Sequence, residues 1–125
     1  MLLDTHILLW FLEDSPKLPL NLKRMIEDSD HVFISIITLW EIAIKLTIGK
    51  LNLQFAFQEL PDFLDSLEIE VLPLSFEDLN DYVNLPLHHK DPFDRILIAQ
   101  AINRSLPLVS KDHEFDAYPI EKIWV

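Results

Sequence analysis

Four carboxylates that are far apart in the sequence each lie close to a point where a predicted strand ends. They are Asp4, Glu41, Asp94 and Asp112. In an open α/β sheet, ligands bind at the edge formed by the carboxyl ends of the strands. A right-handed crossover helix starts at the edge where the preceding strand ended. We therefore expect these four acids at one edge of the sheet, with Asp91 and Asp116 close enough in sequence to join them.

Such a cluster of acids predicts a bound divalent cation. Several carboxylates within a few ångströms of one another cannot all stay ionised without a counterion, because like charges raise each other's pKa. The chain contains no cysteine, so only oxygen and imidazole are available as ligands. Oxygen ligands favour Mg²⁺ or Mn²⁺. A cation held by a few carboxylates can activate water and stabilise the charge that develops on a phosphodiester, which points to phosphate chemistry.

Three of these acids also have an ordinary structural explanation. Asp4 and Asp94 each lie at the start of a predicted helix, where a carboxylate is a favourable cap and interacts well with the helix dipole. Glu41 precedes Lys45 by four residues, the favourable order for a helical ion pair. The helix around Glu41 is apolar on nearly all sides, however, and burying a carboxylate costs far more than such a pair returns. The convergence of the acids, rather than any one of them, favours a site.

The elements that must position these acids alternate along the chain. Short apolar runs typical of buried parallel strands occur at residues 1–3, 31–34, 69–73, 107–109 and 120–124. Helices are predicted at residues 7–12, 20–28, 36–50, 75–85 and 91–102, and residues 51–68 carry apolar residues at helical spacing across Pro61. This alternation predicts a parallel sheet that is covered by helices on both faces.

Composition restricts the class of protein further. With 125 residues, half of them hydrophobic, the chain is expected to form a single domain over residues 1–125. The apolar runs are too short to span a bilayer, and no signal peptide is recognised, so we expect a soluble intracellular protein. The net charge of −11 argues against strong nonspecific binding to nucleic acid and fits either a solvated acidic surface or a basic partner. The single glycine excludes the glycine-rich nucleotide-binding loops.

Four segments together resemble a known family. They read LDTH at residues 3–6, WEIAIK at 40–45, HKDPFDRILIAQA at 89–101 and LVSKD at 108–112. In this order and spacing they are similar to the PIN-domain ribonucleases, and most similar to the VapC toxins of prokaryotic toxin–antitoxin pairs. The resemblance covers nearly the whole chain. One departure is Ser-Lys-Asp at residues 110–112, where the family more often has Thr-x-Asp, a change that leaves the carboxylate in place.

The resemblance implies an α/β fold, a three-layer α/β/α sandwich with a five-stranded parallel sheet. It also implies a Mg²⁺- or Mn²⁺-dependent endoribonuclease, in which water attacks the phosphorus in line. Asp4, Glu41, Asp94 and Asp112 match the family's metal-binding and catalytic acids. Thr5 and Ser110 match its flanking hydroxyls, and Asp91 and Asp116 are supporting acids.

The resemblance further implies partners and a setting. Family members are usually homodimers in the cytoplasm of prokaryotes, where a small antitoxin inhibits them. The C-terminal part of the antitoxin lies in a groove and often presents a basic residue to the acids, which would suit the negative charge of this chain. Lys45, Lys90, Arg95 and Lys111 lie near the expected edge and are our candidates for RNA phosphate contacts. His88 and His89 lie in a polar loop, where we expect them to be exposed.

Other functions remain open at this stage. The chain could keep the fold as a non-catalytic interaction module. A phosphotransfer receiver domain has a similar length and an acidic pocket, but it needs adjacent acids after the first strand, and Asp4 is followed by Thr5. A phosphatase of the haloacid dehalogenase type needs Asp-x-Asp, and residue 6 is His.

Overall fold

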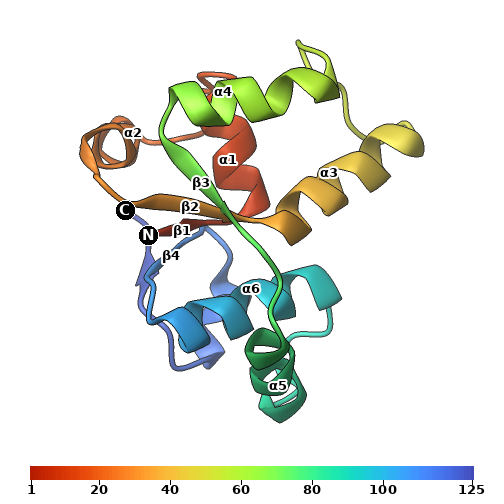
Figure 1. Ribbon diagram of the computed structural model, residues 1–125. Helices are drawn as coiled ribbons and strands as arrows, with labels where there is room; N and C mark the ends of the chain where they lie inside the picture. Colours follow the sequence, from red (N-terminus) through yellow and green to blue (C-terminus); the bar gives the residue numbers. More distant parts are fainter.

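The computed structural model describes residues 1–125, and a five-stranded sheet runs through its centre (Figure 1). The strands are β1 (Leu2–Leu3), β2 (Val32–Ser35), β3 (Ile69–Leu72), β4 (Leu108–Val109) and β5 (Lys122–Ile123). Their order is β3-β2-β1-β4-β5, and every neighbouring pair is parallel. The predicted five-stranded parallel sheet is confirmed, and the chain's first strand lies in its middle.

Helices cover both faces of this sheet. One layer contains α1 (Thr5–Leu12), α2 (Leu20–Asp28), α3 (Ile36–Thr47) and α4 (Leu60–Ser66), and the opposite layer contains α5 (Phe76–Asn84) and α6 (Pro92–Arg104) (Figure 1). Two short 3₁₀ segments, η1 (Phe57–Glu59) and η2 (His113–Ala117), complete the structure. This arrangement confirms the predicted three-layer α/β/α sandwich. None of the helices has the length and hydropathy of a membrane span.

The central strand separates two apolar cores. Successive side chains of a strand point to opposite faces of the sheet. Leu3 belongs to the core beneath α1 to α4, and Leu2 belongs to the core beneath α6. Both leucines are completely buried. Because β1 is packed on both faces and ends at Leu3, the residue that follows it, Asp4, has a firmly determined position.

The helices that border the carboxyl edge of the sheet begin with side-chain caps. Asp4 Oδ1 accepts the Ile7 N–H at the start of α1, with a donor–acceptor distance of 2.9 Å. Ser35 Oγ accepts the Ile37 N–H at the start of α3, at 3.0 Å. The cap of α6 is Asp91, whose Oδ1 accepts the Phe93 N–H at 2.9 Å. Capping therefore explains Asp91, whereas the alternative explanation of Asp94 as the cap of α6 is wrong.

A buried carboxylate joins α5 to α6. Asp78 forms a capping box with Ser75 at the start of α5 and is completely buried. It also accepts hydrogen bonds from three side chains of α6: Gln100 at 3.2 Å, Asn103 at 2.9 Å and Arg104 at 3.2 Å. Burial opposes ionisation of Asp78, but these hydrogen bonds outweigh it and hold its pKa below the ordinary value. Asp78 thus fixes the position of α6, the helix that carries Asp94.

The segment 51–68 differs from the prediction. Its apolar residues occur at helical spacing, yet only Leu60–Ser66 form an α-helix, preceded by the short η1. Pro61 lies in the first turn of α4, where proline is favourable because the missing N–H has no partner within the helix. Phe55, on the irregular stretch before η1, nevertheless packs edge-on against Phe63, with ring centroids 5.0 Å apart. Of these apolar residues, Leu60 and Leu64 are buried, whereas Phe57, Phe63 and Leu67 are exposed, so the pattern predicted only part of the burial and placed the start of the helix too early.

Candidate metal centre

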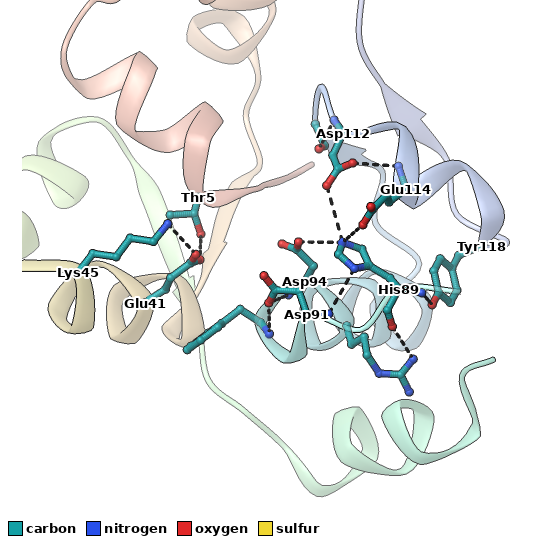
Figure 2. A network of polar contacts seen from close by, with 12 residues as sticks. Thr5, Glu41, Lys45, His89, Asp91, Asp94, Asp112, Glu114 and Tyr118 are labelled. Atoms are coloured by element: carbon teal, nitrogen blue, oxygen red, sulfur yellow. Dashed lines mark hydrogen bonds and ion pairs between the residues drawn. The ribbon is translucent and has the colours of Figure 1, made fainter. Parts of the chain in front are cut away.

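A cleft of about 520 Å³ opens at the carboxyl edge of the sheet. We call it the acidic cleft. Its lining residues are Asp4, Thr5, His6, Trp10, Glu41, Lys45, Asp91, Asp94, Lys111, Asp112 and His113. The four carboxylates that the sequence predicts at one edge therefore line a single cleft. Figure 2 shows two groups of side chains there, one around Glu41 and one around Asp94 and Asp112.

Asp4 lies at the floor of the acidic cleft. The residue is only 6% exposed, because β1 delivers it directly from the buried centre of the sheet. Burial raises the pKa of the Asp4 carboxyl, against the opposing effect of hydrogen bonds from the Ser110 hydroxyl and the Ile7 N–H. The hydroxyl of Ser110, which is completely buried, thus contacts Asp4.

Glu41 is held from two sides (Figure 2). The Thr5 hydroxyl donates to Glu41 Oε1 at 2.7 Å, and the Lys45 Nζ lies 3.1 Å from Oε2. The predicted pair between Glu41 and Lys45 is therefore present, and it occurs inside the cleft. The Glu41 side chain is 14% exposed, so it remains accessible to a small ion.

Asp94 projects from the first turn of α6 toward the other acids. Burial is the main cause that raises the pKa of its carboxyl, to about 7. The negative charges of Asp91, Glu41 and Asp4 raise it further, and His89 opposes them. Burial and the neighbouring negative charges therefore leave Asp94 only partly ionised at neutral pH.

This shift predicts how the stability of the metal-free protein depends on pH. The ordinary pKa of Asp94 is 3.8, and that of the folded state is about 7. Between these values the folded state binds a proton that the unfolded state has lost, so the free energy of unfolding falls as pH rises through this window. We expect the urea midpoint in chelator to fall less steeply from pH 5 to pH 8 for Asp94→Asn than for the wild type. Identical slopes would contradict the shift.

Asp112 reaches the same cleft from the segment after β4. Its backbone N–H donates to Ser110 Oγ at 3.0 Å, and its Oδ1 accepts the Glu114 N–H at 2.9 Å at the start of η2. The other carboxylate oxygen, Oδ2, lies 3.7 Å from His89 Nε2. The neighbouring Lys111 also lines the cleft and is exposed, so its ammonium is available to a phosphate.

Three of the sequence-based candidates lie elsewhere. Asp116 is exposed outside the cleft, where a hydrogen bond from Lys122 at 2.8 Å holds its pKa below the ordinary value. Lys90 is exposed but does not line the cleft. Arg95 is only 5% exposed, and its guanidinium donates to backbone carbonyls, among them that of Pro86 at 3.0 Å. The structure therefore does not support Arg95 as an RNA contact.

His89 and Glu114 are not among the predicted acids, but both contact them. His89 was expected to be exposed, but it is buried, with 7% of its surface accessible. Its Nε2 lies 2.9 Å from Asp94 Oδ2 and 3.1 Å from Oε2 of Glu114 (Figure 2). Nothing in the local sequence distinguishes His89 from His88. Its burial comes from contacts with residues of η2 and α6.

The donor set fits a hard divalent cation. On the sheet side of the cleft, Asp4, Glu41 and Asp94 offer carboxylate oxygens, the ligands that Mg²⁺ and Mn²⁺ prefer. The pKa of Asp94 is raised by burial first and then by the negative charges of Asp91, Glu41 and Asp4, and a cation among these oxygens would oppose that repulsion. On the opposite side, ligand-type atoms of His89, Asp112 and Glu114 lie within 4.8 Å of one another.

Comparisons with known proteins agree with this geometry. The sequence model of the PIN domain family matches residues 1–121. A chain in the structure of VapBC2 from Rickettsia felis, bound to a DNA fragment from their promoter, matches with a TM-score of 0.73 and 20% identity, covering 98% of this chain and 96% of that one. FitAcB from Neisseria gonorrhoeae matches with a TM-score of 0.68 and 21% identity, covering 98% and 96%.

A third solved structure has the same fold. VapBC-5 from Mycobacterium tuberculosis, described as a member of the VapBC family of toxin–antitoxin systems, matches with a TM-score of 0.63 and 21% identity, covering 99% of this chain and 97% of that one. No curated protein sequence matches the chain significantly. At these identities the similarity to the solved structures is one of fold.

Proposed function

Because the chain belongs to the PIN domain family, we propose that it is a Mg²⁺- or Mn²⁺-dependent endoribonuclease and the toxin of a type II toxin–antitoxin pair. The observation that carries this proposal is the convergence of Asp4, Glu41, Asp94 and Asp112 on one cleft from four separate segments. A helix cap accounts for one acid at a time, but it does not account for four acids facing the same space. A metal-binding role accounts for all of them.

In this proposal, Asp4, Glu41, Asp94 and Asp112 hold the cation. When bound, the metal supplies Lewis acidity toward the phosphodiester and toward water. Asp94, whose pKa is about 7 without a cation, would contribute to this site as a carboxylate.

The remaining polar residues of the cleft orient these carboxylates and bind substrate. The hydroxyl of Thr5 occupies one oxygen of Glu41, which fixes the plane of that carboxylate. Lys45 balances the charge of Glu41, and Lys111 lies at the mouth of the cleft. We assign Lys45 and Lys111 to the RNA phosphates, since each is a flexible ammonium beside the acids.

The proposed partners follow from the same family and from charge. One protein of similar fold belongs to a toxin–antitoxin system, and the net charge of −11 suits an antitoxin that presents a basic residue to the acidic cleft. A homodimer is expected as well. An apolar cavity of about 420 Å³, bordered by Trp40 and Phe93, supports this expectation. Trp40 is 59% exposed there, and exposed apolar surface of this kind is typical of protein interfaces.

Asp4→Asn tests the proposed activity. Asparagine caps helices as well as aspartate does, so the variant keeps its α1 cap and its fold while losing a charged ligand. We expect the wild type to cleave bacterial RNA with Mg²⁺ or Mn²⁺ and to stop in EDTA. Asp4→Asn should cleave about 100-fold more slowly. Gel analysis of total RNA, with rates from a fluorescent fragment, measures both.

The matched control is Asp116→Asn, which removes an exposed carboxylate outside the acidic cleft and should leave the rate unchanged. A non-catalytic interaction module makes the opposite prediction. If the folded wild type cleaves no RNA with either metal, or if Asp4→Asn is as active as the wild type, the proposed function is wrong.

A further inference from the structure

The proposed function leaves one buried polar residue without a role. His89 lies in the loop between α5 and α6, and its backbone is held at both ends. The His89 N–H donates to Tyr118 Oη at 2.8 Å, and its carbonyl accepts from Arg95 Nη1 at 3.3 Å. Tyr118 Oη in turn donates to the carbonyl of Pro86 at 2.9 Å. These contacts fix the direction of the imidazole, which points into the acids of the cleft (Figure 2).

A backbone hydrogen bond determines which ring nitrogen carries the proton. The N–H of Asp91 donates to His89 Nδ1 at 3.3 Å. A nitrogen that accepts a hydrogen bond carries no proton, and a neutral imidazole has one donor and one acceptor nitrogen. The proton of the His89 ring is therefore on Nε2. The same residue that caps α6, Asp91, thus sets the tautomer of the histidine in front of it.

The protonated Nε2 faces three carboxylates. It lies 2.9 Å from Asp94 Oδ2, 3.1 Å from Glu114 Oε2 and 3.7 Å from Asp112 Oδ2. None of the three contacts has the geometry of a hydrogen bond, so the N–H is not paired with any single carboxylate. The His89 side chain is 8% exposed, which leaves little water to compete for this N–H. The partial positive charge of this N–H therefore acts on all three acids.

This tautomer disfavours metal binding through His89, although its Nε2 is close enough to Asp112 and Glu114 for the three to share an ion. A histidine that binds a metal through one nitrogen almost always donates an N–H from the other. Here the other nitrogen, Nδ1, faces an N–H donor rather than an acceptor. His89 thus turns its protonated nitrogen toward the carboxylates and leaves the cation to them.

We propose that His89 is a positioning residue, whose Nε2–H holds Asp94 and Asp112 in the orientation from which they bind the metal. The inference rests on the proposed function for the role of these two acids. His89 Nε2 faces the Oδ2 atoms of both, at 2.9 and 3.7 Å, which leaves Asp94 Oδ1 for the cation. Glu114 also faces this N–H, and its side chain, 63% exposed, is the most exposed of the three acids.

Two substitutions distinguish the effect of the Nε2–H donor from the effect of the volume of the ring. His89→Leu fills the space without an N–H, and His89→Gln restores an N–H at similar reach. Loss of a residue that orients a metal ligand typically costs 10–100-fold in metal affinity, so we expect His89→Leu to bind Mn²⁺ at least about tenfold more weakly. His89→Gln should lie within about threefold of the wild type, because the donor is retained. Calorimetric titration with Mn²⁺ measures both, after circular dichroism has verified folding.

Nitrogen NMR tests the tautomer in the wild-type protein and does not depend on whether a variant folds. Protein labelled with [¹⁵N]histidine gives long-range ¹H–¹⁵N correlations that distinguish a protonated ring nitrogen from an unprotonated one. The chain has five histidines, and the His89 signals are those missing from His89→Gln. We expect Nε2 to be protonated in the metal-free protein and to remain so with Mg²⁺ or Zn²⁺. A proton on Nδ1, or loss of the Nε2 proton when metal is added, would overturn the proposal in favour of direct ligation.

The outcomes separate this inference from the proposed function. If the wild type binds Mn²⁺ but cleaves no RNA, the function fails, while the affinities and the tautomer still decide the role of His89. If the wild type cleaves RNA and folded His89→Leu binds Mn²⁺ as tightly as the wild type does, only the positioning role fails. Equal losses in His89→Leu and His89→Gln would also refute it, because the restored donor would then have no effect.

Discussion

Replacing Asp94 with asparagine is expected to slow RNA cleavage by about 10³-fold, equivalent to roughly 4 kcal/mol of transition-state stabilisation. The pKa of Asp94 is raised to about 7 by burial and by the charges of Asp91, Glu41 and Asp4. A neutral amide would be a weaker ligand than a carboxylate and would carry no charge to hold the cation. Single-turnover cleavage of a fluorescent RNA measures the loss.

The same substitution should leave the protein folded. Asp91, not Asp94, caps α6, so asparagine at position 94 removes no cap. Without metal at pH 8 it also relieves the repulsion among the acids, and the melting temperature in EDTA should equal or exceed that of the wild type. Unfolding of Asp94→Asn would show that the carboxylate has a structural role instead, and wild-type cleavage by the folded variant would remove Asp94 from the site.

Replacing Asp78 with alanine is expected to lower the free energy of unfolding by about 3 kcal/mol. The carboxylate is completely buried and accepts hydrogen bonds from Gln100, Asn103 and Arg104. Alanine would leave these donors without their acceptor and would remove the capping box of α5. Urea unfolding monitored by circular dichroism measures the change.

Glu77→Ala is the matched control for this prediction. Glu77 is the residue before Asp78 in the first turn of α5, but it is exposed. Its removal should change the free energy of unfolding by no more than about 0.5 kcal/mol. A loss below about 1 kcal/mol in Asp78→Ala would mean that α6 is held in place chiefly by its apolar packing.

The sequence was sufficient for the sheet and for the gathering of the four acids, because each depends on a local signal. Leu2 and Leu3 are a short apolar run followed by a cap, and that pattern specifies a buried strand that leads into a helix. Once the strands are parallel, the ends of β1 and β4 must meet at one edge, and Asp4 and Asp112 meet with them. Topology, rather than any long-range prediction, brings these residues together.

The environments of His89 and Arg95 could not be read in this way. His89 is buried because Tyr118, 29 residues later, accepts its N–H, and no local pattern records that contact. Arg95 lies on α6, whose residues 95–101 are all buried because the helix packs against α5 and α3 and shares an apolar core with the strands. A helix with no exposed side in this stretch gives no periodic signal, so the direction of a charged residue on it cannot be assigned from spacing.

The loop between α5 and α6 is held almost entirely through its main chain. Arg95 binds the carbonyls of Pro86 and His89, and Tyr118 binds the same two residues through a carbonyl and an N–H. Leu87, which is 75% exposed, and Lys90 contribute nothing to this framework. Positions 87 and 90 can therefore be randomised in a directed-evolution library without altering the path of the loop. Variants selected from such a library would differ in the exposed side chains of this loop and keep its main-chain anchors.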